Sequence, residues 1–146
     1  MRIFLSIKFW GDHRNQEEVR RIIGIIQDLG HEVFCVVEHA ENWGEKTFTP
    51  KHLMSMTLNE IDKSDILVAN VADWPIGVGV EAGYAYAKEI PVVCICSREQ
   101  QLPNTISGIA SSVIKYVDYA ELKVKLIDSL AEHSRAADRE DTAANA

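Results

Sequence analysis

The sequence predicts an α/β domain, a three-layer sandwich around a five-stranded parallel sheet. Strand-like and helix-like segments alternate along the 146 residues of the chain, which is typical of a parallel sheet with helices on both faces. Residues 90–96 are almost continuously apolar, as expected of a strand that is covered on both sides. Right-handed crossovers then favour the flavodoxin-like or Rossmann-like strand order 2-1-3-4-5.

The first half of the chain predicts two strands around one helix. Residues 2–7 are a short apolar run and form the first expected strand. Residues 15–29 carry apolar side chains at spacings of three and four, the period of an amphipathic helix, and Gly30 is expected to end that helix. Residues 32–37 are β-branched and aromatic and predict the second strand. Residues 38–50 show no period and predict a surface loop.

The second half continues the alternation. A helix is expected at residues 50–63 and a third strand at 65–70. A glycine-containing loop then leads into a helix that includes residues 82–88, which precedes the fourth strand. A weaker fifth strand is expected at 112–117, and a last amphipathic helix at 119–132.

Composition indicates one folded domain with an acidic surface. Hydrophobic residues make up 47% and charged residues 25% of the chain, so residues 1–132 are interpreted as a single domain. Residues 133–146 lack large apolar side chains and are expected to be a disordered tail. The net charge is −7 and the isoelectric point is near 5.2. Nucleic acid is therefore excluded as a partner, because phosphate binding needs a dense basic face.

The sequence also favours a cytoplasmic protein without a membrane partner. No apolar stretch approaches the roughly 20 residues of a membrane span, and the N-terminal run lacks the features of a signal peptide. The three cysteines, Cys35, Cys94 and Cys96, each lie in an apolar strand-like run. They are expected to be buried, reduced thiols rather than disulfide partners or metal ligands.

The topology indicates where a ligand site lies. In a doubly wound sheet the site forms at the carboxyl ends of the strands, where the strand order reverses. Three loops meet there, at residues 8–15, 71–79 and 97–107. The middle loop is the most informative, since Gly77 and Gly79 allow the backbone to approach a ligand closely.

Glu81 follows these glycines in the expected first turn of the next helix. The positive end of the helix dipole favours an ionised carboxylate there. A fixed, ionised carboxylate at the mouth of a pocket suits nucleophilic attack on a sugar carbon. A purely structural first-turn acid explains the same position, so the residue alone leaves both interpretations open.

A longer pattern around Glu81 points to a known family. It consists of Asp-Ile-Leu-Val-Ala-Asn at 65–70, Asp73, Gly-Val-Gly-Val-Glu-Ala-Gly-Tyr-Ala at 77–85 and Ile-Pro-Val-Val at 90–93. The pattern resembles the nucleoside 2-deoxyribosyltransferase superfamily, which includes deoxynucleoside 5′-monophosphate N-glycosidases. The resemblance extends in element order over about the first 117 residues, and it implies that Glu81 attacks the sugar C1′.

Two positions depart from the family pattern. Six residues before the glutamate, the transferases carry an aspartate and the nucleotide hydrolases a serine, whereas this chain has Pro75. Asp73 is the catalytic candidate expected to reach the same space. Eight residues before the aspartate of the third strand, the family often has a base-contacting aspartate, and Thr57 stands there. The resemblance therefore implies the reaction class and leaves the substrate open.

The loop after the first strand supplies candidate ligand contacts. Three polar side chains are expected to hold a phosphate or ribose hydroxyls: Ser6, Lys8 and Arg14. Phe9 and Trp10 are candidates for stacking on a nucleobase, although Trp10 equally suits the edge of the core and Arg14 a solvated surface. His13 is an acid–base candidate by its ordinary pKa, or a surface residue.

Further candidates lie in the other loops. Tyr84, three residues after the glutamate, is expected either to hold its carboxylate or to pack. The resemblance implies that Asn104 and Thr105 contribute to a neighbouring subunit's site, and a helix N-cap explains them equally well. Trp43 and Trp74 suit a pocket wall or a dimer contact.

The leading hypothesis is cleavage or transfer of the N-glycosidic bond of a nucleoside or nucleoside 5′-monophosphate. The resemblance implies a covalent glycosyl–glutamate intermediate, no cofactor, and a homodimer or larger assembly. Water or a second base resolves the intermediate, so hydrolase and transferase both stay open. The alternative is a non-catalytic nucleotide-binding sensor on the same fold, in which Glu81 binds ribose hydroxyls.

Overall fold

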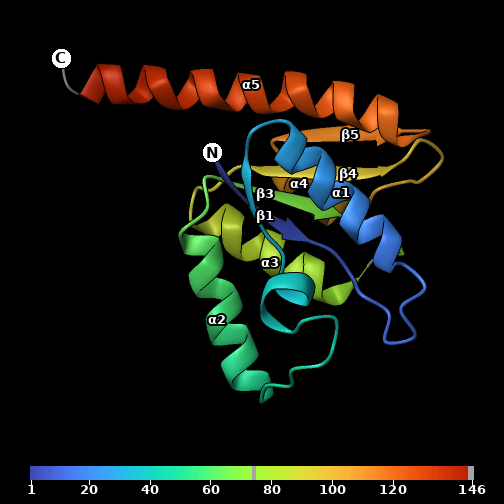
Figure 1. Ribbon diagram of the computed structural model, residues 1–146. Coiled ribbons are helices and arrows are strands. Elements are labelled where there is room, and N and C mark those ends of the chain that lie inside the picture. The colour runs from blue at the N-terminus through green and yellow to red at the C-terminus, as the bar shows by residue number, and fades with distance from the viewer. Residues whose placement is uncertain (74, 145–146) are drawn as a thin grey trace.

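A five-stranded parallel sheet lies at the centre of the computed structural model, which describes residues 1–73 and 75–144 (Figure 1). The strands are β1 Arg2–Ser6, β2 Glu32–Phe34, β3 Ile66–Asn70, β4 Val92–Ser97 and β5 Ser112–Tyr116. Their order is β2-β1-β3-β4-β5 and every pair is parallel. The predicted fold class and strand order are thus confirmed, and the order reverses between β1 and β3.

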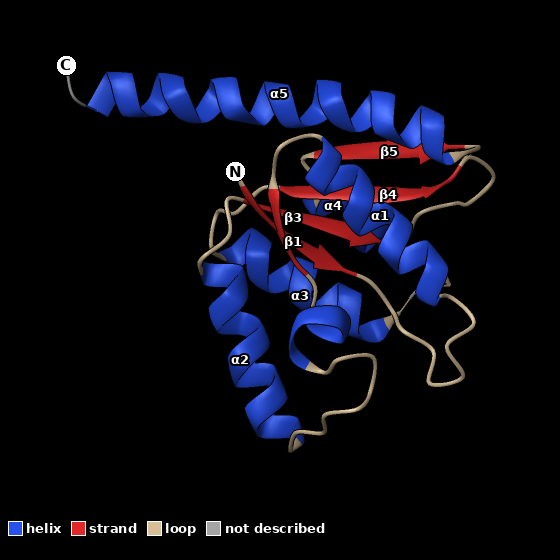
Figure 2. Cartoon of the chain, viewed as in Figure 1, coloured by secondary structure: helices blue, strands red, loops and turns tan. Residues whose placement is uncertain are grey.

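Helices cover both faces of the sheet (Figure 2). They are α1 Gln16–Asp28, α2 Pro50–Asp62, α3 Ile76–Ala87, α4 Asn104–Ile109 and α5 Tyr119–Ala144, with one π-helical turn, η1, at Val36–Ala40. Side chains of α1 and α5 pack on one face of the sheet. Side chains of α3 and α4 pack on the other face, and α2 lies against α3. The result is a three-layer sandwich with one core on each side of the sheet.

The pleat of the strands divides their side chains between these two cores. In β1, Ile3 and Leu5 belong to the core under α1 and α5, whereas Phe4 belongs to the core under α3. All five residues of β3 are buried. Successive side chains of a strand point to opposite faces, so a central strand covered on both sides needs apolar residues throughout. The apolar runs of the sequence follow from this double coverage.

The second strand is shorter than the sequence predicted. We expected residues 32–37 to be extended, but β2 ends at Phe34 and the chain turns into η1. His39 stabilises this turn, since its backbone N–H donates to the Cys35 carbonyl at 2.9 Å. The His39 ring also stacks on Phe34 with 5.4 Å between ring centroids. The turn carries the following residues toward the carboxyl ends of the strands.

Two helical segments also differ from expectation. Residues 104–109, expected to belong to a loop, form the short helix α4. Helix α5 continues to Ala144 instead of ending near residue 132, so residues 133–144 are helical rather than a frayed tail. Alanine and arginine make up six of these twelve residues, and their high helix propensity favours extension of the helix. The boundary of the domain at residue 132 stays a prediction.

The cysteines and the helices agree with the expected chemistry of the interior. Cys35, Cys94 and Cys96 are buried, free thiols, as predicted. Burial raises the pKa of Cys35 to about 12 and that of Cys94 to about 11. Both thiols are therefore protonated and unreactive near neutral pH.

None of the helices in the described part of the chain is long and apolar enough to cross a membrane.

Candidate active site

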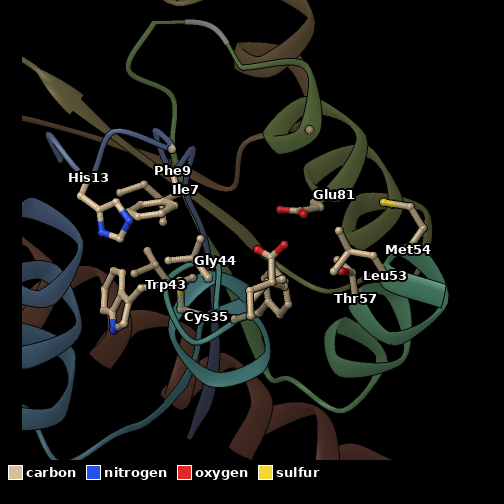
Figure 3. A pocket seen from close by; sticks show the side chains of 17 residues that line it. Ile7, Phe9, His13, Cys35, Trp43, Gly44, Leu53, Met54, Thr57 and Glu81 are labelled. Atoms are coloured by element: carbon tan, nitrogen blue, oxygen red, sulfur yellow. The ribbon is translucent and has the colours of Figure 1, made fainter. Parts of the chain in front are cut away.

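A cavity of about 560 Å³ opens beside the carboxyl end of β1. Its lining comes from the loop after β1, from η1 and the segment that follows it, from α2 and from the first turns of α3. Figure 3 shows Glu81 reaching from α3 into this cavity, with Ile7 and Phe9 on one side and Leu53 and Thr57 on the other. The site thus lies at the predicted edge of the sheet.

The Glu81 carboxyl is held by the end of the neighbouring strand. The Ser6 hydroxyl, at the last position of β1, donates a hydrogen bond to Glu81 Oε2. Ser6 itself is buried, which fixes the donor in place. Burial raises the pKa of Glu81 to about 7, and the hydrogen bond from Ser6 acts in the opposite direction. Both the protonated and the ionised carboxyl are consequently accessible near neutral pH.

Glu81 lies one turn further along its helix than the sequence indicated. Helix α3 begins at Ile76, so Glu81 is in the second turn, and the first turn holds no acidic residue. The favourable effect of the dipole is concentrated in the first turn. The predicted electrostatic reason for an ionised Glu81 is therefore wrong, and the Ser6 hydroxyl takes that role.

A second hollow of about 390 Å³ adjoins the cavity and shares Glu81 with it. Lys8 and Asp73 line this hollow together with Pro75 and Gly77. Asp73 is exposed and has a φ of 58°, a left-handed conformation that aspartate tolerates better than most residues. The structure therefore brings the two predicted catalytic acids to one hollow, with a lysine beside them.

Trp10 lies at the side of this arrangement rather than inside the cavity. The Lys8 ammonium is 3.3 Å and the Arg14 guanidinium 3.5 Å from the centroid of its ring. Asn15 fixes the loop, because its Oδ1 accepts from the Trp10 backbone N–H and its Nδ2 donates to the Lys8 carbonyl. Lys8 and Trp10 line a small hollow that also includes Asp73. The two predicted phosphate-binding cations thus both lie against the Trp10 ring.

Four other predicted residues lie elsewhere. The Tyr84 hydroxyl donates to Asp62 at 2.9 Å, so it does not hold the Glu81 carboxylate. Gly79 and Thr105 line a separate hollow of about 230 Å³ between α3 and α4. Asn104 is exposed at the start of α4. The N-cap of α4 is Pro103 and carries no side-chain hydrogen bond, so the N-cap interpretation of Asn104 and Thr105 is wrong.

Several residues of the cavity lining were not assigned to the site from the sequence. Among them are Cys35, Glu41, Leu53 and Met54, and the last two lie with Thr57 on α2. Leu53 lies in the apolar stripe of the helix expected at residues 50–63, a position that is equally typical of a core residue. Glu41 had no local signal, because only the turn at η1 directs it to the cavity.

Aromatic side chains line the remaining side of the cavity. Phe9 contacts the edge of Trp43 with 5.6 Å between ring centroids and that of His13 with 5.2 Å, and all three residues line the cavity. Trp43 therefore walls the pocket, as one of the two expectations held. Trp74 lies outside the described residues. An aromatic wall of this kind suits the flat apolar face of a nucleobase.

The chain is similar to known proteins over nearly its whole length. A family model described as nucleoside 2-deoxyribosyltransferase matches residues 3–140. Two curated relatives share the name "Putative 2'-deoxynucleoside 5'-phosphate N-hydrolase 1". The relative from Methanosarcina mazei is 28% identical over 131 residues, which are 86% of this chain and 81% of the relative. The relative from Thermofilum pendens is 24% identical over 137 residues, 89% and 94% of the two chains.

Solved structures share the fold. The CMP N-glycosidase BcmB of Clostridium botulinum superimposes with a TM-score of 0.68 at 18% identity, over 86% of this chain and 97% of that one. A 2-deoxyribosyltransferase of Bacillus psychrosaccharolyticus superimposes with a TM-score of 0.67 at 20% identity, over 84% and 90%. At these identities the likeness establishes the arrangement of strands and helices.

Proposed function

Because this chain belongs to the nucleoside 2-deoxyribosyltransferase family, we propose that it hydrolyses the N-glycosidic bond of a 2′-deoxynucleoside 5′-monophosphate with Glu81 as nucleophile. The family's reaction is cleavage or transfer of N-glycosidic bonds in nucleosides or nucleotides. The observation that carries the proposal is the Glu81 carboxyl, which lines a cavity of about 560 Å³ and accepts the Ser6 hydrogen bond. The names of the curated relatives support a 5′-phosphate on the substrate and water as the acceptor.

The proposed reaction has two steps. In the first, a carboxylate oxygen of Glu81 forms a bond to C1′ while the C1′–N bond breaks, and the base leaves with the bonding electrons and takes up a proton from the solvent. In the second, water attacks C1′, loses a proton and releases the carboxylate together with 2-deoxyribose 5-phosphate. Since Ser6 occupies Oε2, Oε1 is the oxygen that attacks.

The charges beside Glu81 support binding of the sugar and its phosphate. Lys8 lines the same hollow as Glu81, and Arg14 shares the Trp10 ring with it. Two cations of this kind suit a phosphate dianion. They substitute for the serine hydroxyl that the nucleotide hydrolases of the family carry at the position of Pro75. Asp73, in the same hollow, accepts a hydrogen bond from a sugar hydroxyl. No cofactor takes part in these steps.

The test is release of free base from a panel of nucleosides, ribonucleotides and deoxynucleotides, followed by chromatography. We expect deoxynucleoside 5′-monophosphates to be hydrolysed by the wild type and Glu81→Gln to retain less than about one per cent of the rate, because an amide oxygen is a far weaker nucleophile than a carboxylate. A slow 2′-fluoro-substituted nucleotide should add one sugar phosphate mass to the wild type and none to Glu81→Gln.

The same panel decides against the alternative function. A nucleotide-binding sensor gives a thermal shift with nucleotides and releases no base. Base release by the wild type together with full activity of Glu81→Gln removes Glu81 from the nucleophile role while leaving an enzyme.

A further inference from the structure

Glu41 is a second acid in the cavity of Glu81, and it comes from a different part of the fold. It follows η1 directly and lines the cavity from the side of η1 and Trp43. The backbone fixes its position, because the Glu41 N–H donates to the Val36 carbonyl at 2.9 Å and the Glu41 carbonyl accepts from Lys46 at 2.9 Å. The side chain thus projects from an ordered turn.

The Glu41 carboxyl has no partner among the described side chains. Among the described residues, none donates a hydrogen bond to this half-buried carboxyl or forms a salt bridge with it. Burial raises the pKa of Glu41, with no neighbouring charge acting against it. No lysine or arginine lines the cavity in the described part of the chain. The carboxyl is thus available to accept a hydrogen bond from a ligand that enters the cavity.

We propose that Glu41 binds the leaving base and selects bases that carry an exocyclic amino group. The inference rests on the proposed function, since it assigns the base to the part of the cavity away from Lys8. Phe9 and Trp43 line the cavity with Glu41 and offer an aromatic surface for the base. The base then lies between this surface and α2, with its polar edge facing Glu41.

Hydrogen-bond chemistry gives the selectivity. An ionised carboxylate only accepts hydrogen bonds, and an exocyclic amino group donates them, as in cytosine, adenine and guanine. Uracil and thymine present a carbonyl oxygen at that position, which faces the carboxylate without a proton between them. Thr57, another polar side chain of the cavity lining, is a neutral hydroxyl that both donates and accepts. The discrimination therefore depends on Glu41.

The test compares dCMP with dUMP, two substrates that share sugar and phosphate and differ in one amino group on the base. We measure kcat/KM at about pH 8, well above the ordinary pKa of a glutamate side chain. The wild type should favour dCMP by at least about tenfold, because a site built for a donor rejects the analogue that lacks it. Glu41→Gln, whose amide both donates and accepts, should bring the ratio to within about threefold of one.

Glu45→Gln is the matched control. Glu45 is an exposed glutamate of the same segment and accepts a hydrogen bond from Asn42, and it does not line the cavity. This variant loses the same charge nearby and should keep the wild-type ratio. A ratio that falls equally in both variants would mean that net charge rather than contact sets the preference, and that result overturns the assignment.

A binding arm separates this inference from the proposed function. Titration calorimetry with dCMP and dUMP is done on Glu81→Gln and on the Glu81→Gln, Glu41→Gln double variant, in which substrate is not consumed. Loss of the dCMP preference on replacing Glu41 supports the inference, even where the wild type shows no turnover and the proposed function fails. Turnover with the same preference in Glu41→Gln overturns the inference and leaves the proposed function intact.

Discussion

The Glu81 carboxyl is subject to two opposed effects, burial and the hydrogen bond from Ser6, with burial the larger. Nucleophilic attack needs the ionised form, so kcat/KM should rise with pH through a midpoint near 7. Ser6→Ala removes a hydrogen bond that favours the ionised form, and its midpoint should therefore move to higher pH. The measurement is a pH–rate profile of both proteins over the same buffers.

Ser64→Ala is the control for this shift, since Ser64 is also buried but its hydroxyl donates to the Glu60 carbonyl at 2.8 Å, away from the site. Its profile should match that of the wild type.

The pH dependence of stability provides a second check on the pKa of Glu81. Folding raises the pKa of Glu81 from 4.5 to about 7, so the folded state binds the proton more tightly and the free energy of unfolding falls as pH rises through this window. Glu81→Gln should lack that part of the fall, and an unchanged pH dependence contradicts the assigned pKa.

At the scale of the element, helix α3 presents a glycine to the cavity. Gly77 lies in the first turn and lines the cavity, and a Cβ there meets no atom within 4 Å. Gly77→Ala should therefore leave folding intact or stabilise the helix by up to about 1 kcal/mol, while its methyl group occupies ligand space and raises KM severalfold. Gly83→Ala, on the same helix and equally unhindered, should show the stability gain alone. Equal KM values for the two variants would exclude a close approach of ligand to Gly77.

The strands and the turn η1 show how much of the fold and of the site a sequence predicts. The strands of the sheet and their order followed from apolar runs and crossover rules, because double burial leaves a continuous signature. Glu81 was identified through the segment around it. Glu41 was not identified from the sequence, because its position in the cavity depends on the early end of β2 at Phe34 and on the turn η1. Contacts of His39 with Phe34 and Cys35 stabilise that turn. Such contacts produce no periodic pattern in the sequence from which the turn could be predicted.

At the scale of the whole molecule, two exposed apolar side chains lie next to the site. Ile76 is 86% exposed and Val80 51% exposed, one turn apart on α3. Thr105 lines the hollow between α3 and α4, and Asn104 is exposed beside it. Apolar side chains exposed next to a ligand site favour an interaction surface. We propose that a second copy of the chain covers this surface, as the family resemblance implies.

This arrangement predicts complementation between two inactive proteins. In a homodimer whose subunits complete each other's sites, Asn104 or Thr105 of one subunit approaches the Glu81 cavity of the other. Glu81→Ala and an Asn104→Ala, Thr105→Ala double variant should each lose activity and regain up to about one quarter of it when mixed and allowed to exchange subunits, because random pairing makes half of the dimers mixed and one of their two sites intact. Light scattering measures the assembly, and a fully active monomer at working concentration contradicts the prediction. Failure of the mixture to regain activity after demonstrated exchange confines each site to a single chain.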